Sequence, residues 1–549
     1  MNRRDALRVG LLGVTSIGSA TALATPRLDA RTPAPTRTGG AARSAAGTVP
    51  IIDASVAELQ DAMQTGRTTS QALVKTYLAR IAAIDRAGPR INAIIEINPD
   101  ALTIADAIDR ERKLSGPRGP LHGIPILLKD NIATADRMQT TAGSFALVGA
   151  QAPRDAFIVG RLRAAGAVIL GKTNLSEWAN IRSTRSTSGW SARGGLTRNP
   201  YALDRNTSGS SSGSGAAIAA SLAAIAVGTE TDGSITSPAS ICGLVGIKPT
   251  LGLLSRDGII PIAHSQDTAG PMTRSVADAA LLLGAMTGID ARDGVTAFSS
   301  GHPTDFTRYL DADGLRGARI GVVRNAMGGN LRLQPIVDAA IATMRQRGAI
   351  LVDVEVPNMN KYGDSELEVL LYELKAGLNK YLAEFARGAP VRTLAQLIAF
   401  NDNNRNREMP YFDQELLIRA EAKGGLDSKQ YLDALANNQR YSRAEGIDQI
   451  MREQRLDALF APTGGPAWVT DFISADHSGD GFSSPAAVAG YPHITVPAGF
   501  LAGLPIGVSF VGGAWSEGTL IKLAYGFEQA TKHRRAPTYA AHASVGAML

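Results

Sequence analysis

Apolar residues recur along this chain with two different spacings, one typical of helices and one typical of buried strands. From Ser55, the run SVAELQDAMQTG begins with a serine cap, has a glutamate three residues later and stops at Gly66, as a capped helix does. The segment TSQALVKTYLARIAAID, at 69–85, predicts a second helix. The apolar runs that predict strands are GIPILLK at 123–129, AVIL at 167–170, ARIGVV at 318–323, DALFAPT at 457–463 and HITVPAGF at 493–500.

The order of these segments predicts the fold class. Strand-like runs alternate with helical segments, among them the Ala-rich apolar stretch at 215–227, which we interpret as a helix. Such alternation favours an α/β/α sandwich with a central mixed or mainly parallel sheet. Residues 360–455 are polar, helical and poor in strand-like runs. We therefore expect a helical cap region inserted into one large domain that spans 49–549.

Composition and charge narrow the possible partners. Of 549 residues, 44% are hydrophobic and 19% are charged, so the chain can bury a large core. The formal net charge is only +6, and no Lys/Arg run interleaved with aromatic residues accompanies it, so we expect no nucleic-acid partner. The seven histidines contain no pair with metal-ligand spacing. We expect no metal and no other cofactor.

Two single residues with reactive side chains have structural interpretations. Cys242 is the only cysteine, so no intramolecular disulfide can form, and its apolar neighbours predict a packed core residue. His122 lies in a turn with Gly123 and Pro125, where we expect a structural role.

The N-terminal sequence predicts export. It begins MNRRDALRVGLLGVTSIGSATALATP, with paired Arg3 and Arg4, a short apolar run and small residues near Ala24. That order is typical of a twin-arginine signal peptide at 1–24, and the apolar run is short for a membrane span. A disordered basic tail is the alternative. Residues 25–48, rich in Thr, Pro, Ala and Arg, are typical of a flexible spacer. We expect a periplasmic or secreted protein with no stable membrane association after cleavage.

Two motifs match familiar patterns but lack the required structural context. GAVILGKT, at 166–173, fits the phosphate-loop pattern, yet its middle residues are themselves strand-like, so they cannot wrap around phosphates. GSSSG, at 209–213, fits the nucleophile elbow of α/β-hydrolases with Ser211 at its centre, but no buried strand leads into it. We interpret neither motif as a functional site.

A third combination joins residues far apart in the sequence. It consists of Lys129 in PILLKDN, the serine-rich loop at 208–214 and Ser234 in TETDGSIT. Ser210 precedes Ser234 by 24 residues, with one helix expected between them, so a loop, a helix and a second loop can bring the two hydroxyl groups together.

These segments resemble the amidase signature family of hydrolases. The resemblance is carried by SGSSSGSGAAIAASLAAIAVGTETDGSITSPASICGLVGIKPT at 208–250, GKTNLSEWAN at 171–180, TRNPYALDRN at 197–206 and DTAGPMTRSVADAA at 267–280, within core motifs at 119–290. Within the family the chain is most similar to bacterial peptide amidases. Thr207, Ser208 and Thr236 stand where many members have Pro, Gly and Arg, which loosens any inference about substrate.

The resemblance implies a Ser-Ser-Lys relay. Ser234 is the expected nucleophile, Ser210 the residue that passes its proton on, and neutral Lys129 the base; a cis peptide bond is expected before Ser210. Lysine is a useful base only when its pKa falls to near 7, and burial alone lowers a lysine pKa by about 3–5 units. Because Asp130 would oppose that shift, we expect its carboxylate to point away from Lys129.

The resemblance also bears on how the transition state is stabilised. Backbone N–H groups of Thr231, Asp232 and Gly233 are expected to bind the oxyanion, and Gly233 gives the turn access to positive φ. Three aromatic residues are candidates to line the acyl pocket, although aromatic side chains more often pack in a core. They are Trp178, Tyr372 and Trp468.

The function expected from these residues is hydrolysis of carboxamides through an acyl-serine, with peptide C-terminal amides as substrate. An aryl acylamidase, or another amide or ester hydrolase of the family, is the alternative. An amidotransferase subunit that feeds ammonia to misacylated tRNA shares the motifs but conflicts with the export signal. A binding protein on an inactive hydrolase scaffold is disfavoured, because Lys129, Ser210 and Ser234 are all present.

Overall fold

The computed structural model describes residues 49–479 and 481–544 of the chain. The expected export signal at 1–24 and the spacer at 25–48 lie outside the described residues.

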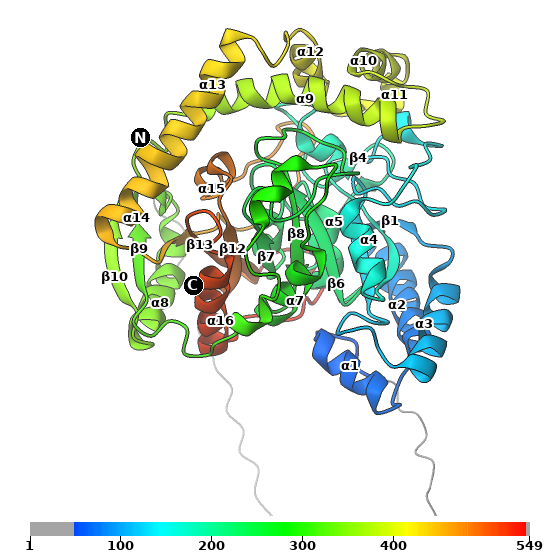
Figure 1. Cartoon of the computed structure of the whole chain (residues 1–549), viewed down its shortest axis with the longest axis horizontal. Coiled ribbons are helices and arrows are strands. Elements are labelled where there is room, and N and C mark those ends of the chain that lie inside the picture. Colours follow the sequence, from blue (N-terminus) through cyan, green and yellow to red (C-terminus); the bar gives the residue numbers. More distant parts are fainter. Residues whose placement is uncertain (1–48, 480, 545–549) are drawn as a thin grey trace, which may run out of the picture. The chain divides into compact units, whose positions relative to one another are not determined.

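Eleven strands form one sheet in the order β1-β3-β2-β6-β8-β7-β12-β13-β11-β9-β10 (Figure 1). Their bounds are β1 Ile94–Ile97, β2 Pro125–Lys129, β3 Val168–Thr173, β6 Ile225–Glu230, β7 Val245–Lys248, β8 Thr268–Thr273, β9 Arg319–Val323, β10 Ile350–Val354, β11 Ala458–Pro462, β12 His493–Leu501 and β13 Leu504–Val511. Two short strands, β4 Trp190–Ser191 and β5 Gly195–Leu196, pair separately.

The sheet is mixed, as the sequence predicted. Strand β2 runs parallel to both β3 and β6, and β9 runs parallel to β10 and β11. The remaining pairs are antiparallel. All residues of β2, β3 and β6 are buried, as expected for strands covered by helices on both faces.

Helices cover the sheet to give an α/β/α sandwich. Helices α7, α8 and α16 pack on β7, β8, β12 and β13. Helix α5 packs on β2, β3, β6 and β8, whereas α6 packs on β7, β12 and β13. The helices outside the cap region are α1 Val56–Gln64, α2 Ser70–Arg80, α3 Ala101–Ser115, α4 Phe157–Ala164, α5 Ser212–Ala219, α6 Thr236–Ile241, α7 Val276–Met286, α8 Gln334–Gln346, α15 Ser484–Ala489 and α16 Glu517–Thr531.

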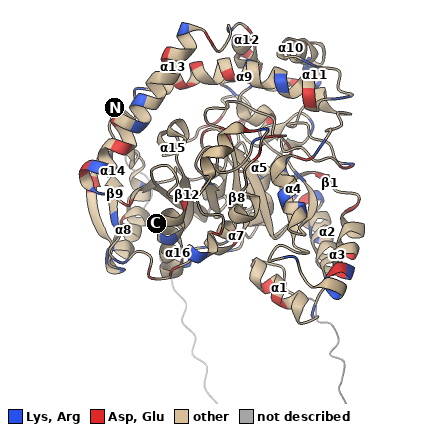
Figure 2. Cartoon of the chain, in the orientation of Figure 1, with Lys and Arg blue, Asp and Glu red and all other residues tan. Residues whose placement is uncertain are grey.

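A helical cap lies along the sheet domain, as the sequence predicted. Its helices are α9 Gly363–Phe385, α10 Leu394–Asn403, α11 Arg405–Glu408, α12 Glu415–Glu421, α13 Lys429–Gln439 and α14 Asp448–Gln454, with a π-helical turn at Arg440–Ile447. Figure 1 shows α9 and α13 as an arch above the central strands. Figure 2 colours many positions of α1, α3, α9, α13 and α14 as Lys, Arg, Asp or Glu, whereas the central strands near β8 and β12 have few such positions. The outer helices therefore present polar faces to solvent.

Two sequence expectations differ from the structure in detail. The stretch at 215–227 is not one helix, because α5 ends at Ala219 and Ile225 begins β6. The β-branched residues Ile225 and Val227 favour a strand, and pairing with β2 and β8 fixes them there. The helix expected over 69–85 is α2 followed by a π-helical turn at Ile81–Arg86. No helix of the described chain is long and apolar enough to cross a membrane.

Candidate active site

The three predicted segments converge at one end of neighbouring parallel strands. Lys129 is the last residue of β2, and Thr229 lies near the end of β6, the strand paired with it. The serine-rich loop leads into α5, and the loop after β6 leads into α6. Because parallel strands end at the same edge of a sheet, the fold brings Lys129, Ser210 and Ser234 to that edge, where α/β proteins bind ligands.

Lys129 is fully buried and its amine faces hydroxyl groups. Nζ donates to Ser210 Oγ at 2.8 Å, to Thr229 Oγ1 at 2.9 Å and to the Thr229 carbonyl oxygen at 3.2 Å. Burial lowers the pKa of Lys129 to about 7, against an opposing effect of the Asp267 and Glu230 carboxylates. Half of the Lys129 side chains are then neutral near pH 7 and able to accept a proton.

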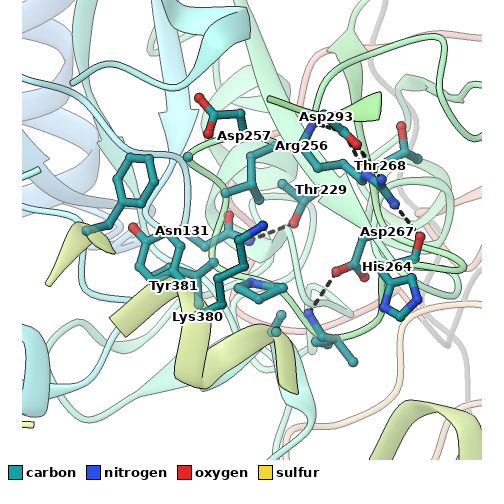
Figure 3. Close-up of a pocket in the computed structure, with 18 of the residues that line it drawn as sticks. Asn131, Thr229, Arg256, Asp257, His264, Asp267, Thr268, Asp293, Lys380 and Tyr381 are labelled. Carbon is teal, nitrogen blue, oxygen red and sulfur yellow. Dashed lines mark hydrogen bonds and ion pairs between the residues drawn. The ribbon is translucent and has the colours of Figure 1, made fainter. Parts of the chain in front are cut away.

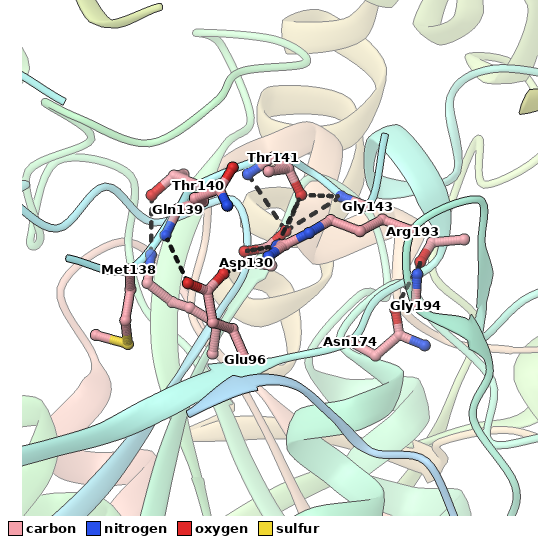
Figure 4. Close-up of polar contacts among 12 residues, drawn as sticks. Glu96, Asp130, Met138, Gln139, Thr140, Thr141, Gly143, Asn174, Arg193 and Gly194 are labelled. Atoms are coloured by element: carbon pink, nitrogen blue, oxygen red, sulfur yellow. Dashed lines mark hydrogen bonds and ion pairs between the residues drawn. The ribbon is translucent and has the colours of Figure 1, made fainter. Parts of the chain in front are cut away.

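The neighbouring carboxylate of Asp130 is directed to partners other than Lys129, as predicted. Its Oδ2 accepts from the backbone N–H of Thr141 at 3.2 Å and of Gly143 at 3.3 Å, and from the Thr141 hydroxyl (Figure 4). Arg193 lies 3.7 Å from the other carboxylate oxygen and also pairs with Glu96. Asp130 therefore shapes the loop after β2 without holding a proton on Lys129.

Hydrogen bonds tie the serine-rich loop to the loop that carries Ser234. The peptide bond between Gly209 and Ser210 is cis, as the family resemblance implied. The backbone N–H of Ser211 donates to the Ser234 carbonyl oxygen at 3.1 Å. The hydroxyl groups of Ser208 and Ser237 lie 2.8 Å apart. These two hydrogen bonds flank Ser210 and fix the serine-rich loop against the Ser234 loop.

The phosphate-loop and elbow patterns have structural roles. Ser211, the centre of the elbow-like motif, is fully buried, and its hydroxyl donates to the Thr229 carbonyl oxygen at 3.1 Å. In the phosphate-loop-like motif, Val168–Thr173 form β3, and Lys172 Nζ donates to the Ile132 carbonyl oxygen at 2.6 Å and to Thr140 Oγ1 at 2.9 Å. Ser211 is therefore not an exposed elbow nucleophile, and the phosphate-loop-like residues 168–173 form a buried strand rather than a ligand-binding loop.

The loop before Ser234 presents backbone donors. Within residues 49–479 and 481–544, no acceptor pairs with the backbone N–H groups of Thr231, Asp232, Gly233 and Ser234. Gly233 has φ +74°, in the left-handed region that favours glycine. Ser234 is 8% exposed, whereas Lys129 and Ser210 are at 0%. Of these three residues, Ser234 is the one with solvent-exposed surface.

Carboxylates hold this loop from both ends. Glu230 accepts from the N–H groups of Ile235 at 2.7 Å and Thr236 at 2.9 Å, so it fixes the turn after Ser234. Asp267 accepts from the Thr231 hydroxyl at 2.5 Å. Burial raises the pKa of Asp267 to about 6. These two anchors were not predicted from the sequence: Glu230 lies within the TETDGSIT motif, whereas Asp267 reaches the loop only through tertiary contact.

Two cavities flank the loop. One, of about 310 Å³, is lined by Ser208, Gly209, Asp232, Gly233 and Trp468 among others, and its lining, among the described residues, contains no Lys, Arg or His. The other, of about 340 Å³ (Figure 3), is lined by residues that include Asn131, Thr229, Asp267, Lys380 and Tyr381. A substrate can therefore reach the Ser234 loop from the first cavity without meeting a cationic side chain.

The candidate pocket aromatics divide between cavity and core. Trp468 lines the smaller cavity, and its indole N–H donates to Asp476 at 3.2 Å. Trp178 and Tyr372 line neither cavity: Trp178 is buried in an apolar cluster, and the Tyr372 ring lies 5.7 Å from that of Tyr431. For these two residues the core interpretation is correct.

Cys242 and His122 have the structural roles that the sequence predicted. Burial raises the pKa of the Cys242 thiol to about 12, so it is an unreactive core group. His122 is buried; its ring bonds to the Arg118 N–H at 3.3 Å and the Ile108 carbonyl at 3.1 Å. In the described part of the chain, no group of three or more His, Cys, Asp and Glu side chains is arranged to hold a metal ion.

Known proteins share this architecture over nearly the whole described chain. The amidase family model matches residues 72–521. The native peptide amidase of Stenotrophomonas maltophilia is 52% identical, with a TM-score of 0.86 over 89% of this chain and 99% of that one. A structure of the peptide amidase PAM in complex with the competitive inhibitor chymostatin is 52% identical, with a TM-score of 0.85 over 88% of this chain and 98% of that one.

A plant relative extends the same family. A protein of Arabidopsis thaliana named "Probable amidase" is 43% identical over 90% of this chain and 93% of its own length. The similarity therefore spans the sheet, the site and the helical cap rather than a single motif. The chain belongs to the amidase signature family and is an enzyme that hydrolyses amide C–N bonds.

Proposed function

We propose that Lys129, Ser210 and Ser234 form a relay that hydrolyses carboxamides through an acyl-serine intermediate. The observation that carries the proposal is the 2.8 Å hydrogen bond from Lys129 Nζ to Ser210 Oγ, made by a lysine whose pKa is about 7. Neutral Lys129 takes the Ser210 proton while Ser210 takes the proton of Ser234. The Ser234 oxygen then bonds to the amide carbon.

The backbone N–H groups of the loop stabilise the charge that develops. As the tetrahedral intermediate forms, its oxyanion accepts from N–H groups of Asp232, Gly233 and Ser234, and one such donor is typically worth about 2.7–4 kcal/mol. The backbone N–H of Thr231, which was also expected to donate, has no acceptor within the described residues either, so it is a fourth candidate donor, while the Thr231 hydroxyl anchors the loop to Asp267. The proton held by Lys129 returns to the leaving nitrogen, the C–N bond breaks, and water hydrolyses the ester on Ser234.

The substrate that we propose is a peptide with a C-terminal amide. Two observations support it: the 52% identity to a peptide amidase over almost its full length, and a polar cavity beside Ser208 and Asp232. Neutral carboxamide and peptide groups suit this cavity, because its polar lining residues offer hydrogen-bond partners. Its described lining has no Lys, Arg or His side chain that would favour a negatively charged substrate.

Incubation with a C-terminally amidated peptide tests the substrate. We expect ammonia release, a full-length product whose terminal amide has become an acid, and no internal cleavage. Ser234→Ala abolishes release, whereas Ser300→Ala, at an exposed position that lines neither cavity, retains it. Hydrolysis of a simple aryl amide without any reaction of the peptide would instead assign the protein to the aryl acylamidase group.

Labelling separates an enzyme from an inactive scaffold. A fluorophosphonate probe is expected to modify native protein at Ser234 and to spare Ser234→Ala. A native protein that stays unlabelled contradicts the nucleophile assignment.

The compartment is part of the same proposal. We propose export by the twin-arginine route, supported by Arg3, Arg4 and the short apolar run that follows them. Replacement of both arginines by lysine is expected to retain the protein in the cytoplasm with its N-terminal segment uncleaved. Periplasmic accumulation of that variant contradicts the route.

A further inference from the structure

A contact between two carboxyl groups joins the helical cap to the Ser234 loop. Glu366 lies in the first turn of α9, and its side chain is in hydrogen-bond contact with that of Asp232. Asp232 also accepts from Ser484 Oγ at 2.5 Å. Gln266 Nε2 donates to Glu366 Oε1 at 2.9 Å and to the carbonyl oxygen of Thr231 at 3.3 Å. The cap thus reaches the loop at two successive residues.

Ionised carboxylates accept hydrogen bonds but cannot donate them. A hydrogen bond between the side chains of Glu366 and Asp232 therefore requires a proton on one of the two carboxyl groups. Burial, and then the charge of Asp232, raise the pKa of Glu366 well above its usual range. The proton therefore lies on Glu366, whose O–H donates to Asp232. Losing that proton replaces a hydrogen bond by repulsion between two negative charges.

The loop reached by this contact carries the donors for the oxyanion. Asp232 supplies one of the four adjacent backbone N–H groups, from Thr231 to Ser234, that have no acceptor within the described residues. Shifts of about 1 Å at a catalytic group lower rates by about a hundredfold, so the orientation of Asp232 matters for turnover. A negative charge gained beside the loop also opposes formation of the oxyanion.

We propose that Glu366 is a positioning residue for amide hydrolysis: its protonated carboxyl group bonds to Asp232 and, through Gln266, to Thr231, and so holds the oxyanion loop in its productive position. The inference rests on the proposed function of Ser234. The positioning role implies that enzyme activity falls at alkaline pH, when Glu366 loses its proton. Glu366 belongs to the cap and touches neither the substrate nor the nucleophile.

Other ionisable groups face this contact from the surrounding elements. Glu230, at the end of β6, is already held by the N–H groups of the turn after Ser234. Lys248, at the end of β7, interacts with Asp232; burial lowers its pKa to about 8, so it also titrates in the alkaline range. Tyr362, just before α9, has a raised pKa because of burial, Asp232 and Glu366. Ser484, the first residue of α15, donates its hydroxyl to Asp232, and Asn438 of α13 accepts from Ser365, the residue before Glu366.

The test compares pH profiles of kcat/KM for release of ammonia from an amidated peptide by the native full-length protein, Glu366→Gln and Asp364→Asn. Gln has the shape of protonated Glu, donates to Asp232, accepts from Gln266 and cannot ionise. We expect native activity to fall about tenfold per pH unit on the alkaline side, and Glu366→Gln to lack that fall. Asp364 is an exposed carboxylate in the same turn of α9, so Asp364→Asn retains the native fall.

The outcomes separate this inference from the function on which it rests. An alkaline fall in Glu366→Gln equal to that of the native protein overturns the positioning role and points to Lys248 or Tyr362. If Glu366→Gln does not fold, Glu366→Met gives the same comparison: its activity near neutral pH is about tenfold lower than native, yet it shows no alkaline fall. Native protein that releases no ammonia and takes no fluorophosphonate label at any pH refutes the proposed function and the inference together.

Discussion

The amine of Lys129 lies 2.8 Å from the hydroxyl oxygen of Ser210, and both side chains are fully buried. A charged ammonium is poorly solvated there, whereas a neutral amine is an acceptor for the Ser210 proton. The same burial that makes lysine an unfavourable core residue therefore makes it a base near neutral pH.

Replacing Ser210 separates a relay hydroxyl from a structural one. Ser210→Ala removes the hydroxyl that faces Lys129 and is expected to lower kcat by about 10²–10⁴-fold, the usual contribution of general acid–base catalysis. Ser211→Ala is the matched control, because Ser211 is equally buried but bonds only to backbone groups of Thr229. We expect it to lose about 1 kcal/mol of stability and less than about tenfold in kcat. Equal losses of kcat in the two variants contradict the relay.

The activity of the native enzyme is expected to rise with pH through the Lys129 titration. Because burial lowers the pKa of Lys129 to about 7, protonated and inactive lysine dominates below that pH. The acid limb of kcat/KM then has an inflection near neutral pH and a slope of one proton. Rates of an amide substrate measured across this range check it. An acid limb with its inflection near the ordinary pKa of a carboxyl group would instead indicate a carboxylate base.

Much of the fold and of the site can be predicted from the sequence, and the exceptions share a physical cause. The runs that end at Lys129 and Thr463 predicted β2 and β11 because buried parallel or central strands are continuously apolar. Strand β8, TAGPMT, has no such run and forms only because β6 and β7 pair with it. Local sequence does not encode that pairing.

The supporting residues of the site were missed for a related reason. Asp267 contacts Thr231, which lies 36 residues earlier in the chain (267 − 231). Glu366 contacts Asp232, which lies 134 residues earlier (366 − 232). Lys129, Ser210 and Ser234 were identifiable because each lies in a recognisable motif. A carboxylate that acts through tertiary contact has no such local signature.

Lys129 is expected to lower the stability of the folded protein near neutral pH. Its folded pKa, about 7, lies below the ordinary lysine value of 10.5, so between these values the unfolded chain binds a proton that the folded chain does not. Stability contributed by this residue therefore rises with pH across that window, and its penalty is fully present below pH 7. A difference of about 3.5 pKa units corresponds to roughly 5 kcal/mol as an upper limit.

Lys129→Met tests that penalty. The variant keeps an unbranched side chain of similar length without a charge, so it is expected to be inactive but more stable than native protein at pH 7 by up to a few kcal/mol. The gain is reduced because the Ser210 and Thr229 hydroxyl groups lose a partner. Denaturant unfolding at neutral and alkaline pH checks both sign and trend. A gain that grows with pH contradicts the direction of the pKa shift.

Gly233→Ala is expected to impair the oxyanion loop more than the fold. Gly233 has φ +74°, and a Cβ added there would lie 3.0 Å from Ser483 Oγ. The left-handed conformation costs a residue with Cβ about 1–2 kcal/mol, and relief of that strain turns the N–H groups of Gly233 and Ser234 away from the oxyanion. Because one misplaced donor typically lowers kcat by about 10²–10³-fold, the loss should fall on kcat while KM changes little. Gly294→Ala is the control, since its added Cβ would meet nothing within 4 Å. Native kcat in Gly233→Ala would show that the loop does not need this conformation, and would move the oxyanion donors elsewhere.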